Sequence, residues 1–74
     1  MILNTMQEKY YKKLYRRARG KYSARSLQES YNWLESNYTG ETRKAIRHQM
    51  DSPSWMTTVE LMLRETLRAI IKKE

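Results

Sequence analysis

The 74-residue chain contains no cysteine and no phenylalanine, and it has only one proline, two glycines and one histidine. Without cysteine, disulfide bonds and thiolate zinc sites are excluded. No run of about 18 apolar residues is present, so a membrane-spanning helix is not expected. The first residues have neither the charged start nor the apolar run of a signal peptide, and residue 2 is not glycine. These absences predict a cytoplasmic protein.

Few side chains could support catalysis or bind a metal ion. His48 is the only histidine and Asp51 the only aspartate. A nucleophile needs a nearby base that a third group holds in place. Ser52 and Ser54 follow His48 in the sequence, but Ser52 is better explained as a helix cap. We therefore expect a protein that is not an enzyme, with no metal and no cofactor, and with His48 on a polar surface.

Positive charge is concentrated in the first third of the chain. The formal net charge is +7; residues 1–25 contain eight basic side chains and one acidic one, Glu8, whereas the two signs balance over residues 26–74. The basic residues of the first segment are Lys9, Lys12, Lys13, Arg16, Arg17, Arg19, Lys21 and Arg25. Such asymmetry predicts contact with nucleic acid, an acidic protein or an anionic membrane.

The spacing of apolar residues predicts four helices, which cover about residues 5–19, 26–37, 41–50 and 53–72. Thr5 with Glu8, and Ser26 with Glu29, have the spacing of capping boxes. Gly20 is expected to end the first helix in the left-handed conformation. The break at residues 51–53 predicts that serine 52 caps the last helix and that proline 53 occupies its first position.

Each predicted helix has one apolar face. These faces consist of Leu3, Met6, Tyr10 and Leu14; of Ala24, Leu27, Tyr31, Leu34 and Tyr38; of Ala45, Ile46 and Met50; and of Trp55, Val59, Met62, Leu63, Leu67 and Ile70. The prediction is an all-α fold, a compact bundle of three or four short helices forming one domain over residues 1–74, with the last helix central. Leu61 and Ile71 would widen the apolar face of the last helix, whereas Trp33 lies off the face of its own helix. The alternative is a homodimer seam through the C-terminal helix, with Leu61, Ile71 or Trp33 outside the monomer core. Glu60 and Arg64 are spaced as an ion pair on that helix.

The segment from residue 9 to residue 25 combines cations with tyrosines. Lys and Arg neutralise phosphates and release counterions, and tyrosines stack on unpaired bases or donate hydrogen bonds to phosphate. The interleaved tyrosines are Tyr11, Tyr15 and Tyr22, and the cations in one helical sector are Lys9, Lys12, Arg16 and Arg19. We interpret the segment as a phosphate-tracking helix. The alternative is a solvated face whose tyrosines pack inward, although the repulsion among unbalanced cations argues against it.

The second and third predicted helices are also compatible with a helix-turn-helix. The residues facing base edges would then be Thr42, Arg43, Arg47 and Gln49. The sequence departs from the usual motif, because Tyr31 and Glu35 stand near the places where that motif has a small residue and a glycine. If the third helix packs beside the first, the phosphate-binding patch would gain Arg43, Lys44 and Arg47.

These observations predict a small, basic, non-catalytic nucleic-acid-binding protein, for example a regulator, whose N-terminal helix contacts phosphates of DNA or RNA. The alternative is a protein-interaction module, such as an inhibitor or adaptor, that docks on an acidic protein, because charge complementarity would speed either encounter. A helix lying on an anionic membrane is the third possibility. It is less favoured because the few apolar residues of the first helix are needed for the core.

Overall fold

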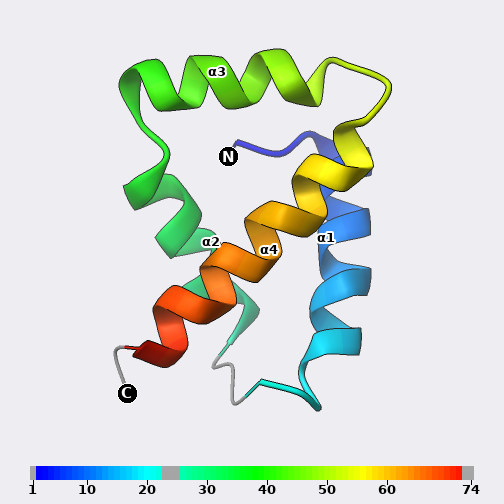
Figure 1. Ribbon diagram of the computed structural model, residues 1–74. Coiled ribbons are helices and arrows are strands. Elements are labelled where there is room, and N and C mark those ends of the chain that lie inside the picture. The colour runs from blue at the N-terminus through cyan, green and yellow to red at the C-terminus, as the bar shows by residue number, and fades with distance from the viewer. Residues whose placement is uncertain (1, 23–25, 73–74) are drawn as a thin grey trace.

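The computed structural model describes residues 2–22 and 26–72 of the chain, and within them all regular structure is helical (Figure 1). The helices are α1 (Thr5–Ala18), α2 (Leu27–Asn37), α3 (Gly40–Met50) and α4 (Trp55–Lys72). The all-α bundle predicted from the sequence is confirmed. Ala24 and Arg25, which the sequence placed in the core and in the phosphate-binding patch, lie outside the described residues. No helix in the described ranges combines the length and the apolar character needed to cross a membrane.

α4 is the central helix, which is one of the two interpretations that its wide apolar face allowed. It packs against α1, α2 and α3, and Figure 1 shows it running obliquely between them. Its buried apolar residues are Val59, Met62, Leu63, Leu67 and Ile70. Thr66 is also buried, and its hydroxyl donates to the carbonyl of Met62 at 2.7 Å, which satisfies the polar group within the helix. Leu61, by contrast, is 50% exposed.

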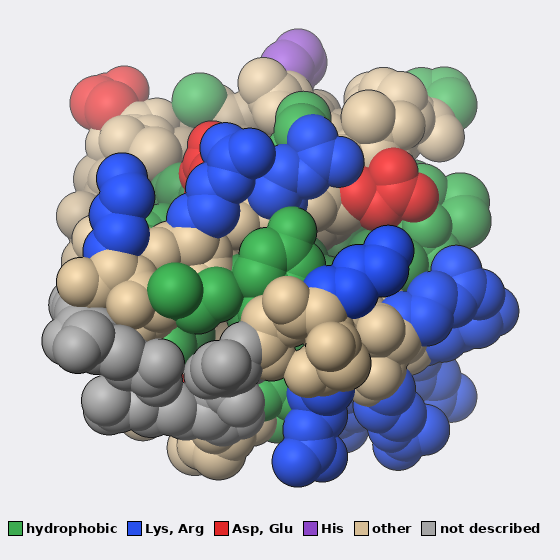
Figure 2. Space-filling model, turned by 60° about the horizontal axis from the view of Figure 1, so that its bottom comes forward, with side chains coloured by type: hydrophobic (Ala, Val, Ile, Leu, Met, Phe, Trp, Pro, Cys, Tyr) green, Lys and Arg blue, Asp and Glu red, His purple; other side chains and the backbone are tan. Residues whose placement is uncertain are grey.

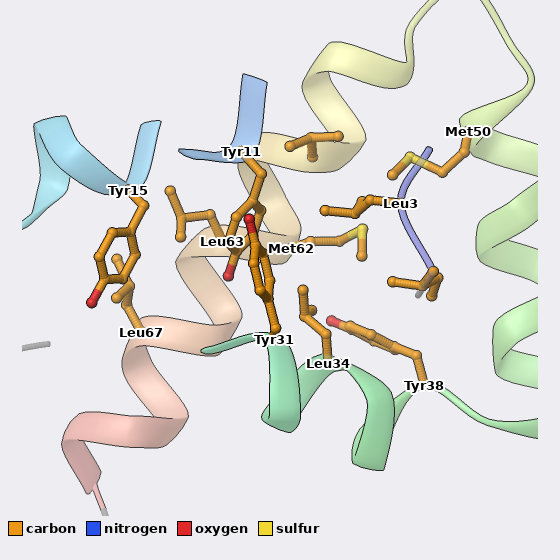
Figure 3. Close-up of a cluster of buried hydrophobic side chains, with 12 residues drawn as sticks. Leu3, Tyr11, Tyr15, Tyr31, Leu34, Tyr38, Met50, Met62, Leu63 and Leu67 are labelled. Carbon is orange, nitrogen blue, oxygen red and sulfur yellow. The ribbon is translucent and has the colours of Figure 1, made fainter. Parts of the chain in front are cut away.

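Tyrosine rings fill much of the core of this phenylalanine-free chain (Figure 3). The buried tyrosines are Tyr11, Tyr15, Tyr31 and Tyr38. The rings of Tyr11 and Tyr31 lie with their centroids 5.5 Å apart, which joins α1 to α2. Aromatic rings bury a large apolar area, so the tyrosines supply volume that a short chain needs.

The buried face of α1 differs from the predicted one. Gln7, Tyr11 and Tyr15, spaced four residues apart, point inward, whereas Met6 is 59% exposed and Tyr10 is only half-buried. Gln7 can be buried because its amide donates to the carbonyl of Met50 at 3.1 Å. A polar residue therefore occupies a core position that apolar spacing does not recognise, and the helix is rotated by about one residue from the expectation.

The cap of α1 also lies one residue earlier than predicted. The Asn4 side chain accepts from the backbone N–H of Gln7 at 2.9 Å, and the Gln7 side chain accepts from the backbone N–H of Asn4 at 3.1 Å. This reciprocal pair is a capping box, so the predicted box of Thr5 and Glu8 is wrong. Ser26 caps α2, since its hydroxyl accepts from the backbone N–H of Glu29 at 3.2 Å, which is one of the two hydrogen bonds of the predicted capping box.

Two other predicted helix boundaries are wrong in detail. Gly20 does not adopt a positive φ; the described glycine that does is Gly40, with φ 56°, at the start of α3. The break before α4 is present, but this helix begins at Trp55. The Ser52 hydroxyl donates to the carbonyl of Gln49 at 2.6 Å instead of capping α4, because the chain makes tight turns there before the helix begins.

α3 contributes less to the core than predicted. Met50 is buried, Ile46 is half-buried and Ala45 is exposed. The apolar space under α3 is taken by the N-terminal segment, whose Ile2 and Leu3 are buried. Figure 1 shows this segment passing between α3 and the other helices.

Candidate functional site

The cations of α1 lie on the side of the helix that faces away from the core. Tyr11 and Tyr15 fix the inward side, so Lys9, Lys13 and Arg16 project outward. The described cations of α1 and the following turn are all exposed or half-exposed, and we call them the cationic face: Lys9, Lys12, Lys13, Arg16, Arg17, Arg19 and Lys21. Figure 2 shows Lys and Arg side chains gathered along one edge of the molecule, at the lower right of the view.

Ion pairs neutralise little of the cationic face. The Lys12 ammonium lies 3.4 Å from a carboxylate oxygen of Glu8, in a solvent-exposed pair four residues apart. Within residues 2–22 and 26–72, no other member of the cationic face forms an ion pair. Like charges held together on one surface produce a positive potential that extends into solvent. The cations are therefore available to an anionic partner.

Two tyrosines assigned to this face from the sequence are core residues. Tyr11 is 0% exposed and Tyr15 is 4% exposed, so neither ring can reach a ligand. Burial raises the pKa of Tyr11, consistent with a hydroxyl removed from water. The prediction that these two rings stack on bases is wrong. Their spacing of four from each other and from Gln7 was the signal for a buried face. Tyr22, in the turn after α1, remains half-exposed.

The arginines of α3 bind other parts of the same chain. The Arg43 guanidinium donates to the carbonyl of Tyr38 at 2.9 Å and lies 2.7 Å from the carboxylate of Glu35. Arg47 donates to the carbonyl of Ile2 at 3.1 Å, and the backbone N–H of Ile2 donates to Glu35 at 2.8 Å. Together these contacts fasten the N-terminal segment to α2 and α3.

α3 therefore does not extend the cationic face in the way the sequence suggested. It crosses one end of the bundle and packs mainly on α4 (Figure 1). Lys44 is 78% exposed and lies 3.5 Å from Glu41. A recognition helix would present Thr42 and Gln49, which are exposed, but its two arginines are engaged internally. The geometry thus favours α1 over α3 as the interface.

A groove between α1 and α4 adjoins the cationic face and was not predicted from the sequence. It has a volume of about 320 Å³, and we call it the α1–α4 groove. Its floor is apolar and consists of Leu14, Ala18, Leu63 and Leu67. In Figure 2 hydrophobic side chains are visible between two groups of Lys and Arg side chains. The groove is open to solvent, so a flat group could enter it from the surface.

The rim of the α1–α4 groove is mainly positive. Arg17 and Lys21 line it from α1 and the following turn, and Arg64 lines it from α4. Tyr22 adds an aromatic ring, and Glu60 adds one carboxylate. The groove thus combines an apolar floor, an aromatic side chain and three cations, which come from α1, from the turn after it and from α4.

Arg64 is the functional candidate that sequence reasoning missed. It was assigned as the ion-pair partner of Glu60, but Glu60 instead accepts from the hydroxyl of Tyr10 at 2.6 Å, and this hydrogen bond raises the pKa of Tyr10. No ion pair involves Arg64 in the described part of the chain. Arg64, Arg68 and Lys72 recur every four residues and are exposed, and this spacing was a signal for a second cationic row.

The residues weighed for catalysis show no assembled set. His48 is exposed on α3, and the Ser52 hydroxyl lies 3.0 Å from the hydroxyl of Ser54. Across residues 2–22 and 26–72, no three His, Asp or Glu side chains lie together in a way that could hold a metal ion.

Comparison of the chain with protein-family models, with curated proteins and with solved structures finds no match.

Proposed function

We propose that this protein is a non-catalytic nucleic-acid-binding protein whose cationic face contacts phosphates. The observation that carries the proposal is the set of exposed cations on α1 and the following turn, of which only Lys12 has a carboxylate partner among the described residues. A row of unpaired cations costs stability through self-repulsion. A polyanion that binds this row relieves the repulsion and releases its own counterions.

The geometry of α1 suits a phosphate backbone. Lys9, Lys13 and Arg16 follow one another at spacings of three and four residues, so they lie along a single line parallel to the helix axis. The inward side of the helix is occupied by tyrosines, which keeps the cations directed outward. Contacts of this kind position the backbone of a nucleic acid and carry little sequence information.

A salt titration tests the proposal. Binding of fluorescent DNA and RNA oligonucleotides is measured by anisotropy over a series of salt concentrations. The logarithm of the affinity should fall linearly with the logarithm of the salt concentration. Lys13→Gln should reduce the slope by about one, and the triple variant Lys9→Gln, Lys13→Gln, Arg16→Gln by about three.

Lys44→Gln is the matched control, because it removes an exposed lysine, and the same unit of charge, from α3. It should leave the slope unchanged. The proposal fails if no oligonucleotide binds at low salt, or if Lys13→Gln and Lys44→Gln have the same effect.

An acidic protein partner would contact the same cations, and a pull-down distinguishes it from nucleic acid. The pull-down uses the purified protein and is performed with and without nuclease. Under the proposal, captured material is lost after nuclease treatment. A stoichiometric partner that stays bound after nuclease treatment but is released at high salt would show that the protein binds an acidic protein and not nucleic acid.

A further inference from the structure

The α1–α4 groove has features that phosphate binding alone does not require. A helix that only follows a phosphate backbone needs exposed cations, whereas this groove presents an apolar floor of Leu14, Ala18, Leu63 and Leu67 between them. Leu14 and Ala18 are only half-buried, so part of this apolar surface meets solvent. Covering it with a flat apolar group would be favourable.

The rim determines what kind of group would be held there. Arg17, Lys21 and Arg64 approach the groove from two sides, and none of them has an ion-pair partner within residues 2–22 and 26–72. Tyr22 supplies a ring that can stack. A planar ring attached to phosphates would meet both parts of the site, because the ring covers the floor while the phosphates lie on the rim.

We propose that the α1–α4 groove holds an unpaired base of a single-stranded nucleic acid, with the phosphates on either side of that base held by Arg17, Lys21 and Arg64. This inference rests on the proposed function and specifies the form of nucleic acid that the protein prefers. The carboxylate of Glu60 disfavours a phosphate at its end of the groove, so the strand follows the cations. Tyr22 stacks on the base, as aromatic residues do in other single-strand-binding proteins.

A duplex cannot fill the groove in the same way, because its bases are stacked in the interior. It can present phosphates to the rim but no base to the floor. The apolar surface of Leu14 and Ala18 would then remain uncovered. Single strands should therefore bind more tightly than duplexes, although both meet the cationic face.

The size of the groove also argues against a helix of a partner protein. Its volume of about 320 Å³ lies at the lower end of the range for small-ligand pockets, about 300–1,000 Å³. A stable protein interface buries about 800 Å² on each partner, which is far more than a groove formed by nine residues offers. One base, and not a helix, matches this space.

The test compares a fluorescent oligothymidylate with a blunt-ended duplex that has the same number of phosphates. At equal salt, the single strand should bind the unmodified protein about tenfold more tightly or better. Ala18→Leu fills the groove without altering charge, and it should reduce this preference while leaving duplex binding unchanged. Because Ala18 is half-buried near the end of α1, the variant should fold, which circular dichroism verifies.

The matched pair Arg64→Gln and Arg68→Gln tests the rim. Both residues are exposed on α4, one turn apart, but only Arg64 lines the groove. Arg64→Gln should lower the single-strand affinity and reduce its salt slope by about one, whereas Arg68→Gln should change neither.

Two results would overturn the inference in different ways. Equal binding of single strand and duplex, or equal effects of the two arginine variants, would refute the groove as a base site and leave the proposed function intact. Binding of neither nucleic acid would refute both. If the protein binds neither nucleic acid but does bind an acidic peptide, its partner is a protein.

Discussion

The buried tyrosines of this protein differ in the hydrogen bonding of their hydroxyl groups. Tyr11, Tyr31 and Tyr38 are buried, and the hydroxyl of Tyr38 donates to the carboxylate of Glu65. The hydroxyl of Tyr31 is buried and makes no hydrogen bond within the described residues. Burial raises the pKa of Tyr31 to about 12. These hydroxyls should therefore contribute differently to stability.

Removing each hydroxyl separates the two cases. Tyr31→Phe should leave the free energy of unfolding unchanged or raise it, because a desolvated, unpaired hydroxyl is lost while the ring remains. Tyr38→Phe should lower it by about 1–2 kcal/mol, because the Glu65 carboxylate loses its donor. Urea denaturation of the three proteins at neutral pH measures both changes. Equal destabilisation by the two substitutions would show that the Tyr31 hydroxyl has a partner after all.

Glu35 should make stability sensitive to acid. The Arg43 guanidinium holds the pKa of Glu35 below its usual value, so the folded state binds this proton less readily than the unfolded state. The stabilisation is therefore present at neutral pH and is lost as the pH falls through the lowered pKa. Its size should be below about 1 kcal/mol, because both side chains are 40% exposed.

The measurement compares the unmodified protein with Glu35→Gln from about pH 6 to about pH 3. The difference in unfolding free energy should shrink as the pH decreases, because the protonated carboxyl loses its ion pair. Glu41→Gln is the control, since Glu41 is 91% exposed and its pair with Lys44 is 3.5 Å long. A difference that stays constant with pH would contradict the role assigned to Glu35.

At the scale of single helices, α1 is positioned by a polar residue as much as by apolar ones. Gln7 takes part in the capping box and also donates to the carbonyl of Met50 at the end of α3. It thereby fixes both the start of the helix and its rotation about its own axis. This rotation places Tyr11 inward and Lys9, Lys13 and Arg16 outward, so the function proposed for α1 depends on its cap.

Substitution of the cap tests this element. Asn4→Ala should lower the free energy of unfolding by about 1 kcal/mol, because a backbone N–H of the first turn loses its acceptor. Thr5→Ala, one residue later and exposed, should have little effect, since threonine is already inside the helix. The reverse order in thermal or urea unfolding would restore Thr5 as the cap and contradict the observed start of α1.

For the whole molecule, the net charge of +7 should lower stability while it favours the proposed binding of a polyanion. Most of the excess lies on the cationic face, where salt screens repulsion in the free protein and also weakens attraction to a polyanion. Added salt should therefore raise the stability of the free protein and lower its affinity for a polyanion, so one salt series can measure both effects.

Leu61 is exposed on α4. The homodimer seam through the C-terminal helix stays a prediction.

Raising the salt concentration from about 0.05 M to about 0.5 M should therefore stabilise the free protein, by up to about 1 kcal/mol, while it weakens nucleic-acid binding. The triple variant Lys9→Gln, Lys13→Gln, Arg16→Gln should lose most of the salt-induced rise in Tm. Scanning calorimetry without nucleic acid measures this effect. A Tm that falls with salt would show that attractive ion pairs, and not repulsion, dominate the surface.

Four helices, their approximate ends and the central place of α4 could be predicted from the sequence, because apolar spacing and turn residues act over a few neighbouring positions. The concentration of cations in the first third was equally visible. The rotation of α1 was not predicted, because the spacing of its two buried tyrosines leads to the polar Gln7, and Gln7 is buried through a hydrogen bond to Met50, which is distant in the sequence. That rotation decided which tyrosines are buried.

Only the tertiary structure brought Arg64 beside Arg17 and Lys21, paired Arg43 with Glu35 and tied Arg47 to the N-terminal segment. Charge and helical spacing determine that a helix will be basic on one side. Which basic side chains stay free, and which apolar surface lies between them, depends on how separate helices pack, because these contacts join residues that the sequence keeps far apart.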